Sequence, residues 1–257
     1  MAGPADRVTL ATLRAMKTEG RKIAGIVAWD APTARIVDRA GVDLVSVGDS
    51  VGVSLWGRDA PLDVTVEEMV LVCRAVRRGV ERALLSCDLP YGPLQQGPAA
   101  AVEAARRLVE DGGAEVVKLD GVAERPEAVA AVAEVGIPVF AQMGSTPQGG
   151  AHATGVEELV AQARRLEEAG ASLIDFTESG PVAGPAVVAA VSVPVLGGIG
   201  GGPWLDGRVR AIHRAVGSAP SALDEPPDAY ANVAHVVYDA VRAYADDVRA
   251  GRQVRGG

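Results

Sequence analysis

Short apolar runs alternate along the chain with longer amphipathic stretches. Each run is rich in Val, Ile and Leu, and leads through a Gly- or Asp-bearing loop into a stretch rich in Ala, Glu and Arg. This alternation predicts βα units and a parallel sheet. The apolar runs predict strands at residues 22–28, 43–48, 83–87, 115–119, 138–143, 172–176 and 194–199, and a weaker one at 209–212. The amphipathic stretches predict helices at residues 31–40, 65–78, 98–111, 125–135, 156–169 and 182–191.

Glycines mark the ends of several predicted helices. They stand just before the next apolar run, at the C′ position where glycine is favoured; they are Gly41, Gly113, Gly136 and Gly170. Seven or eight βα units favour a closed barrel over an open sheet. We therefore expect an α/β fold, a single-domain (β/α)8 TIM barrel spanning residues 1–257 with its barrel at about 20–217. An N-terminal helix should precede the barrel, and a long C-terminal helix should cover about residues 227–254.

Composition agrees with an aliphatic core and excludes some functions. Apolar residues make up 48% of the chain but aromatic ones only 4%, as suits strands buried on both faces. The net charge is −8 with both signs mixed, and no basic block or aromatic set is present, so we expect no nucleic-acid partner. No apolar run reaches the roughly 18 residues of a membrane helix, and no signal core is seen. Cys73 and Cys87 form no CxxC pair, so we expect a reduced, cytoplasmic protein without a membrane partner.

Polar residues follow nearly every predicted strand, where a parallel barrel carries its catalytic groups. Asp49, Asp88 and Asp120 follow strands two, three and four, which are neighbours in a barrel. Solvation at the surface would explain any one of them. Together on one rim they would repel each other unless a cation lay between them, and Mg²⁺ takes one or two carboxylates with waters and substrate oxygens. An α-keto acid offers two such oxygens, and the cation would then stabilise an enolate.

A series of motifs occurs in a fixed order between residues 8 and 217. It runs through MKTEGRKIAGIVAWD, VSVGDSVGVSLWGRDAPLDVTVEEM, LLSCDLPYG, VVKLDG, MGSTPQ, TESGP and VPVLGGIGGG. On these motifs the sequence resembles the ketopantoate hydroxymethyltransferase family, within the phosphoenolpyruvate mutase/isocitrate lyase superfamily. The resemblance implies transfer of a one-carbon unit from 5,10-methylenetetrahydrofolate to 3-methyl-2-oxobutanoate, giving ketopantoate on the way to pantothenate. It also implies a homo-oligomer.

The resemblance further implies roles for the acidic residues and one serine. Asp49 and Asp88 would be the Mg²⁺ ligands, and Asp120 stands near the metal where the family usually has Glu. Ser50 would contact the substrate carboxylate, and Asp88 lies at the substrate as well. Because Asp120 is one methylene shorter than Glu, it would reach the metal through water.

The remaining implied roles concern charge and proton transfer. Lys118 would neutralise substrate or enolate charge, and Glu178 is the nearest match to the catalytic glutamate. Gln142 stands where the family has a substrate-binding His, and it can only hydrogen-bond where His can carry charge. The run before Glu178 is one residue longer than usual, so either a bulge keeps Glu178 in place or Thr177 points inward. His152, in the shortened lid segment GGAHATG, is either a lid residue or a solvated loop histidine.

These departures fall on site positions beside intact scaffold motifs, as expected of a diverged member of the family. The leading hypothesis is Mg²⁺-dependent hydroxymethyl transfer to an α-keto acid. The first alternative is an aldolase or C–C lyase that acts on a different keto acid. The second is an inactive paralogue that binds a ligand or partner.

Overall fold

The computed structural model describes residues 7–144 and 155–256 of the chain. Within them, parallel strands in sequence order close a barrel, β1 to β8, as predicted. The strands are β1 (Ile23–Val27), β2 (Leu44–Val47), β3 (Leu84–Asp88), β4 (Val116–Leu119), β5 (Val139–Gly144), β6 (Ala171–Thr177), β7 (Val195–Gly197) and β8 (Gly207–Ala211). Strand β7 ends two residues before the predicted limit at residue 199, and β8 begins two residues before the predicted start at 209. The (β/α)8 prediction is confirmed.

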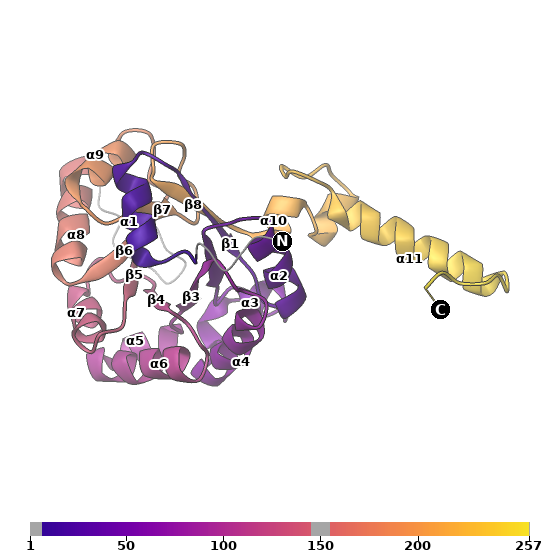
Figure 1. The fold of residues 1–257 in the computed structure, drawn as a ribbon, viewed down its shortest axis with the longest axis horizontal. Helices are drawn as coiled ribbons and strands as arrows, with labels where there is room; N and C mark the ends of the chain where they lie inside the picture. The colour runs from indigo at the N-terminus through magenta and orange to yellow at the C-terminus, as the bar shows by residue number, and fades with distance from the viewer. Residues whose placement is uncertain (1–6, 145–154, 257) are drawn as a thin grey trace. The chain divides into compact units, whose positions relative to one another are not determined.

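Helices form a ring outside the strands (Figure 1). The helices of the described residues are α1 (Leu10–Thr18), α2 (Ala31–Arg39), α3 (Val51–Ser54), α4 (Val66–Arg77), α5 (Tyr91–Gln96), α6 (Pro98–Glu110), α7 (Pro126–Glu134), α8 (Val156–Glu168), α9 (Ala183–Ala190), α10 (Ile212–Val216) and α11 (Val233–Arg249), with 3₁₀ turns at Pro61–Asp63 and Pro220–Leu223. Of these, α10 and α11 are not part of the ring and belong to a separate unit of the chain. The predicted N-terminal and C-terminal helices are both present, as α1 and α11.

Local sequence signals fix several helix ends. Asp30 caps α2, because its carboxylate accepts a hydrogen bond from the Thr33 N–H at 2.8 Å. Thr65 opens α4 in a capping box with Glu68. The glycines predicted at helix ends all have the left-handed backbone expected there, with φ of 91° at Gly41, for example.

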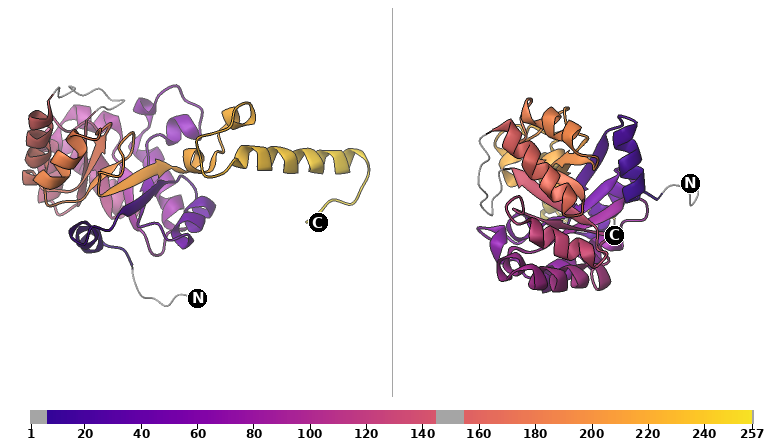
Figure 2. Two further views of the ribbon diagram at one scale, coloured as in Figure 1. Left: turned by 90° about the horizontal axis from the view of Figure 1, so that it is seen from above. Right: turned by 90° about the vertical axis from the view of Figure 1, so that its left-hand side faces the viewer.

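The barrel core is closed at its amino-terminal end by α1. Leu13 and Met16 of this helix pack in one cluster with the first inward side chain of each strand, such as Ile23 and Phe140. Two further views show α1 lying across one end of the ring (Figure 2). The opposite end, where the strands finish, is therefore the end available for a site.

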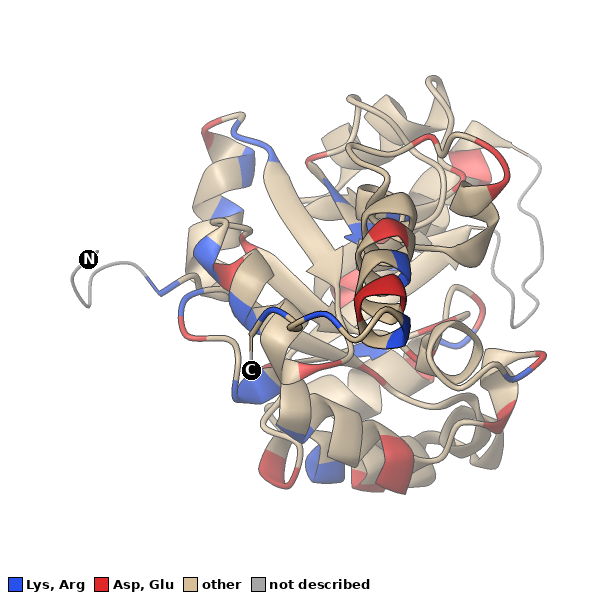
Figure 3. Ribbon diagram, turned by 90° about the vertical axis from the view of Figure 1, so that its right-hand side faces the viewer, with Lys and Arg blue, Asp and Glu red and all other residues tan. Residues whose placement is uncertain are grey.

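The chain divides into two compact units, Met1–Val209 and Arg210–Gly257. The first contains the barrel through most of β8, and the second contains α10 and α11. Acidic and basic positions are interspersed along the helices of both units (Figure 3). No helix in the described parts of the chain combines the length and apolar character needed to cross a membrane. That the whole chain forms one domain stays a prediction.

Candidate active site

Three aspartates meet where strands β2, β3 and β4 end. Asp88 is the last residue of β3, Asp120 follows β4 directly, and Asp49 lies two residues beyond β2. All three are buried, and each offers a carboxylate oxygen within 4.8 Å of the others. The predicted acidic cluster at the carboxyl end of the barrel is thus present. Its members come from neighbouring strands because the sequence order of a (β/α)8 barrel is also its order in space.

The donor set of this cluster suits a hard cation such as Mg²⁺. Within the described residues, Asp88 Oδ1 is buried and has no hydrogen-bond partner. Its other oxygen, Oδ2, accepts a bond from the Asp49 N–H at 3.3 Å. A buried oxygen without a donor carries a free-energy cost that a bound cation would remove. The three residues therefore fit the metal that the sequence predicted.

Lys118 lies among these carboxylates on the inward side of β4. Its ammonium forms a short ion pair with Asp120, and it stands 3.6 Å from Asp88 Oδ2 and 3.7 Å from Asp175 Oδ2. Burial by itself would lower the pKa of Lys118, but the surrounding carboxylates outweigh it and hold the pKa well above its ordinary value. Lys118 therefore stays protonated beside the acidic cluster.

Burial and mutual repulsion raise the pKa values of the carboxylates, whereas the charge of Lys118 lowers them. Burial raises the pKa of Asp88 well above its ordinary value, and the charges of Asp120 and Asp49 raise it further, against the pull of Lys118. The pKa of Asp175 is raised for the same first reason, with Asp120 adding to it. The site thus holds more carboxylates than one ammonium can neutralise, and it favours an added positive charge.

Asp175 is part of the site, although from the sequence it was only one of the polar residues at a strand end and was given no role. Its Oδ1 accepts the Gly198 N–H at 2.8 Å, and the Gln142 side-chain amide donates to the same carboxylate. Gln142 Oε1 in turn accepts the Gly121 N–H at 3.2 Å. Gln142, predicted to bind substrate, is therefore held by protein groups at both ends of its amide. The amide nitrogen carries a second hydrogen that could serve a substrate, and the substrate-binding role of Gln142 stays a prediction.

A register shift in β6 decides which residues face the barrel interior. Val139 pairs with Ala171 and Phe140 with Leu173, so Ser172 is an extra residue in β6. Beyond it, side chains alternate inward at Leu173, Asp175 and Thr177. The register shift lies at the start of the strand, and it does not keep Glu178 facing inward as the bulge expected from the sequence would have done.

The shift places Thr177 inward and leaves Glu178 outside the buried cluster. Thr177 is 1% exposed, and its hydroxyl donates to the Met143 carbonyl at 3.1 Å. The Glu178 side chain is exposed, its φ is 52°, and its N–H donates to the Ile199 carbonyl at 2.8 Å. Of the two readings of this segment, the inward Thr177 is the one found. The proposed proton transfer by Glu178 stays a prediction.

Other residues named from the sequence have varied positions. Ser50 is part-buried and follows Asp49, and its hydroxyl lies 2.7 Å from where a Cβ at Gly48 would be. It is thus beside the cluster. His152 and the rest of the segment 145–154 lie outside the described residues.

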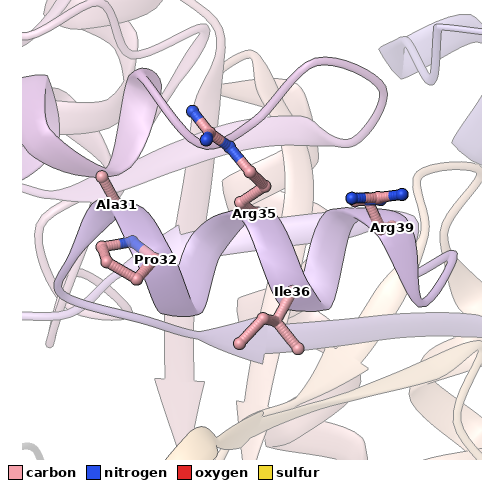
Figure 4. Close-up of a pocket in the computed structure, with 5 residues that line it drawn as sticks. All are labelled: Ala31, Pro32, Arg35, Ile36 and Arg39. Atoms are coloured by element: carbon pink, nitrogen blue, oxygen red, sulfur yellow. The ribbon is translucent and has the colours of Figure 1, made fainter. Parts of the chain in front are cut away.

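A separate groove lies on the outer surface of α2. It measures about 350 Å³ and is lined by residues of that one helix (Figure 4). Its lining includes Arg35, Arg39 and Ile36, and Ile36 is 69% exposed. The groove contains no carboxylate of the cluster and is not the candidate active site.

Fold and site together define a class: a (β/α)8-barrel enzyme with a buried acidic cluster at the carboxyl ends of its strands. The family model for ketopantoate hydroxymethyltransferase matches residues 7–253. The 3-methyl-2-oxobutanoate hydroxymethyltransferase of Salinibacter ruber is 37% identical over 253 residues, covering 95% of each chain. That of Gloeobacter violaceus is 38% identical over 262 residues, covering 95% of this chain and 97% of the relative. The chain belongs to the ketopantoate hydroxymethyltransferase family and is a transferase that forms carbon–carbon bonds.

Solved structures of lower similarity share the fold. The structure of 2,3-dimethylmalate lyase, a member of the PEP mutase/isocitrate lyase superfamily, aligns with a TM-score of 0.63 at 16% identity. The alignment covers 94% of this chain and 87% of that one. This likeness shows a shared barrel fold.

Proposed function

We propose that the protein catalyses Mg²⁺-dependent hydroxymethyl transfer from 5,10-methylenetetrahydrofolate to an α-keto acid, with 3-methyl-2-oxobutanoate as the substrate. The observation that carries the proposal is the cluster of Asp49, Asp88 and Asp120, whose oxygens lie within 4.8 Å of one another beside a buried lysine. The named activity of the relatives supports the substrate and the bond that is formed.

The acidic residues of the site would bind the cation, and Lys118 and Ser50 would bind the substrate carboxylate. Asp49 and Asp88 would hold the cation, with Asp120 close enough to bind it directly or through water. When bound, Mg²⁺ would supply a Lewis acid for the keto oxygen. Lys118 would attract the substrate carboxylate and offset negative charge that develops as the carbon next to the keto group loses its proton. Ser50 would donate a hydrogen bond to the substrate carboxylate.

Proton exchange isolates the first chemical step from the choice of aldehyde donor. Proton NMR in D₂O would follow the C3 proton of 3-methyl-2-oxobutanoate, with enzyme and with or without Mg²⁺. We expect loss of the signal only with Mg²⁺, and a loss of exchange on the order of 10²-fold or more in Asp49→Asn. Asp38→Asn is the matched control, because Asp38 is equally buried but binds backbone N–H groups, among them that of Ala83 at 2.7 Å.

The outcomes separate the hypotheses. Exchange that does not need Mg²⁺, or that survives in Asp49→Asn, would refute the metal assignment. Exchange without product when methylenetetrahydrofolate is added would move the aldolase or lyase alternative ahead. No exchange from a folded wild-type protein, and no Mg²⁺-linked binding of keto acids by calorimetry, would favour the inactive paralogue.

We also propose that the protein self-associates through α11. This helix carries exposed apolar side chains at heptad spacing, at Val237, Val241, Tyr244 and Val248. Each is more than half exposed, and a second copy of the same stripe would bury them. Light scattering should give a multimer for wild type and a smaller species for Val241→Asp, with Asp239→Asn unchanged. A wild-type monomer would contradict the proposal.

Cys73 and Cys87 are both free thiols, in keeping with the proposed cytoplasmic location.

A further inference from the structure

Lys118 competes with a cation for the same carboxylates. Of the three acidic groups around its ammonium, Asp88 and Asp120 belong to the acidic cluster, and Asp120 makes the shortest contact. When these two carboxylates bind Mg²⁺, they neutralise the charge of Lys118 less well than they do without the cation. A buried ammonium left without a counter-ion is costly, so cation binding requires another carboxylate for Lys118.

Asp175 is the carboxylate near Lys118 that stands outside the acidic cluster. It is 3% exposed, and its Oδ2 lies 3.7 Å from Lys118 Nζ. That distance is longer than a hydrogen bond, so a small movement of the flexible lysine chain would close it. Asp175 thus has room to receive the ammonium.

The Asp175 carboxylate is held in place for this contact. Gly198 N–H binds Oδ1 at 2.8 Å, and Gln142 donates to the same group. A Cβ at Gly198 would stand only 3.0 Å from Oδ2, so the backbone there lies against the carboxylate. Groups from β5 and from the end of β7 therefore hold the Asp175 carboxylate of β6 in one position. Lys118 is the side chain that moves.

We propose that Asp175 is a positioning residue that receives the Lys118 ammonium when Asp88 and Asp120 take up Mg²⁺. This inference rests on the proposed metal site and goes beyond it. The lysine moves between two sets of carboxylates and keeps its charge, so it remains directed at the substrate carboxylate. Removing Asp175 would leave Lys118 bound to the metal ligands and would weaken the cation site.

The test is the affinity for Mg²⁺ alone, measured by titration calorimetry. Asp175→Asn keeps an oxygen for the Gly198 N–H but loses the charge. We expect Mg²⁺ to bind about 10- to 100-fold more weakly, the range for residues that support metal ligands. In a Lys118→Met background, the same substitution should change the affinity by less than about twofold, because the competing ammonium is gone.

Asp206→Asn is the matched control. Asp206 is also buried, accepts the Val195 N–H at 2.9 Å and pairs with Lys17 at 3.0 Å, away from the acidic cluster. Its substitution should lower thermal stability without changing Mg²⁺ affinity. If Asp175→Asn fails to fold, Gly198→Ala presses on the same carboxylate and should weaken Mg²⁺ binding less strongly.

The outcomes distinguish this inference from the proposed function. The role of Asp175 is overturned if Asp175→Asn binds Mg²⁺ with the same affinity as wild type. It is also overturned if the substitution weakens Mg²⁺ binding equally in the wild-type and Lys118→Met backgrounds. Either result leaves the proposed metal site unaffected. Wild type that does not bind Mg²⁺ overturns both. If Asp175→Asn is unfolded and Gly198→Ala binds as wild type does, the role of Asp175 is also refuted.

Discussion

Replacing Asp88 by Asn should separate stability from function. Asp88 Oδ2 lies 3.6 Å from the Lys118 ammonium, an attraction of about 5 kcal/mol at an effective dielectric constant near 20. The oxygens of Asp49 and Asp120 lie within 4.8 Å, and each repels a charged Asp88 by about 3.5 kcal/mol or more on the same scale. Repulsion therefore exceeds attraction by about 2 kcal/mol when no cation is bound.

The realised effect on stability is smaller than the full repulsion between charged groups, because the raised pKa of Asp88 lets the carboxyl take up a proton. We expect Asp88→Asn in EDTA to be between neutral and about 2 kcal/mol more stable than wild type, a rise in Tm of up to roughly 4–8 °C for a chain of this size. A saturating cation should reverse the order. At about 100 times its Kd, Mg²⁺ would stabilise wild type by about 2.7 kcal/mol and leave the variant unchanged.

Differential scanning calorimetry in EDTA and in Mg²⁺ gives both comparisons. Asp38→Asn serves again as the control, since it loses a buried carboxylate that accepts backbone N–H groups. It should be less stable than wild type in both buffers. The reasoning is refuted if Asp88→Asn is clearly less stable than wild type in EDTA, or if Mg²⁺ still raises its Tm.

Two further predictions concern proton transfer and acid stability. If Glu178 carries the C3 proton, Glu178→Gln should slow exchange by about 10²-fold or more while Thr177→Val does not; equal rates would remove Glu178 from that role. Arg58 and the Thr65 N–H, the latter at 2.9 Å, hold the pKa of Glu68 at about 2. Because this pKa is lower in the folded state than in the unfolded state, ionised Glu68 stabilises the fold above the ordinary carboxyl pKa. This stabilisation is lost as the pH falls from about 4.5 to about 2. Denaturant unfolding should therefore show Glu68→Gln about 1 kcal/mol less stable at pH 7, allowing for partial exposure, and the difference should shrink below pH 3; a constant difference would contradict the ion-pair account.

Local patterns were sufficient to predict the barrel and the acidic cluster. Each βα unit has its own apolar run, helix and terminal glycine, so no long-range information was needed to place it. The order of strands in a barrel then turned sequence neighbours into spatial neighbours, which brought Asp49, Asp88 and Asp120 together. Short helices such as α3 and α5 were not predicted, because four to six residues are too few to show a helical period.

Side-chain direction in β6 could not be predicted by counting along the chain. One extra residue reverses the face of every later side chain, and Ser172 is such a residue. The run before Glu178 is one residue longer than in the family that the sequence resembles, and the sequence does not show where the extra residue lies, so the faces of Thr177 and Glu178 stayed open. Register is set by pairing with β5, which is a property of the folded barrel.

A signal for the correct register was nevertheless present in the strand itself. Ile174 and Phe176 alternate with Asp175 and Thr177, so the apolar pair and the polar pair occupy opposite faces. The outer face of a barrel strand packs against helices, where an unpartnered carboxylate would cost several kcal/mol. Asp175 must then face inward, toward the lysine and the amide donors, and the extra residue must precede it. Burial of the strand's outer face thus identifies Asp175 as a site residue and Thr177, not Glu178, as the inward side chain.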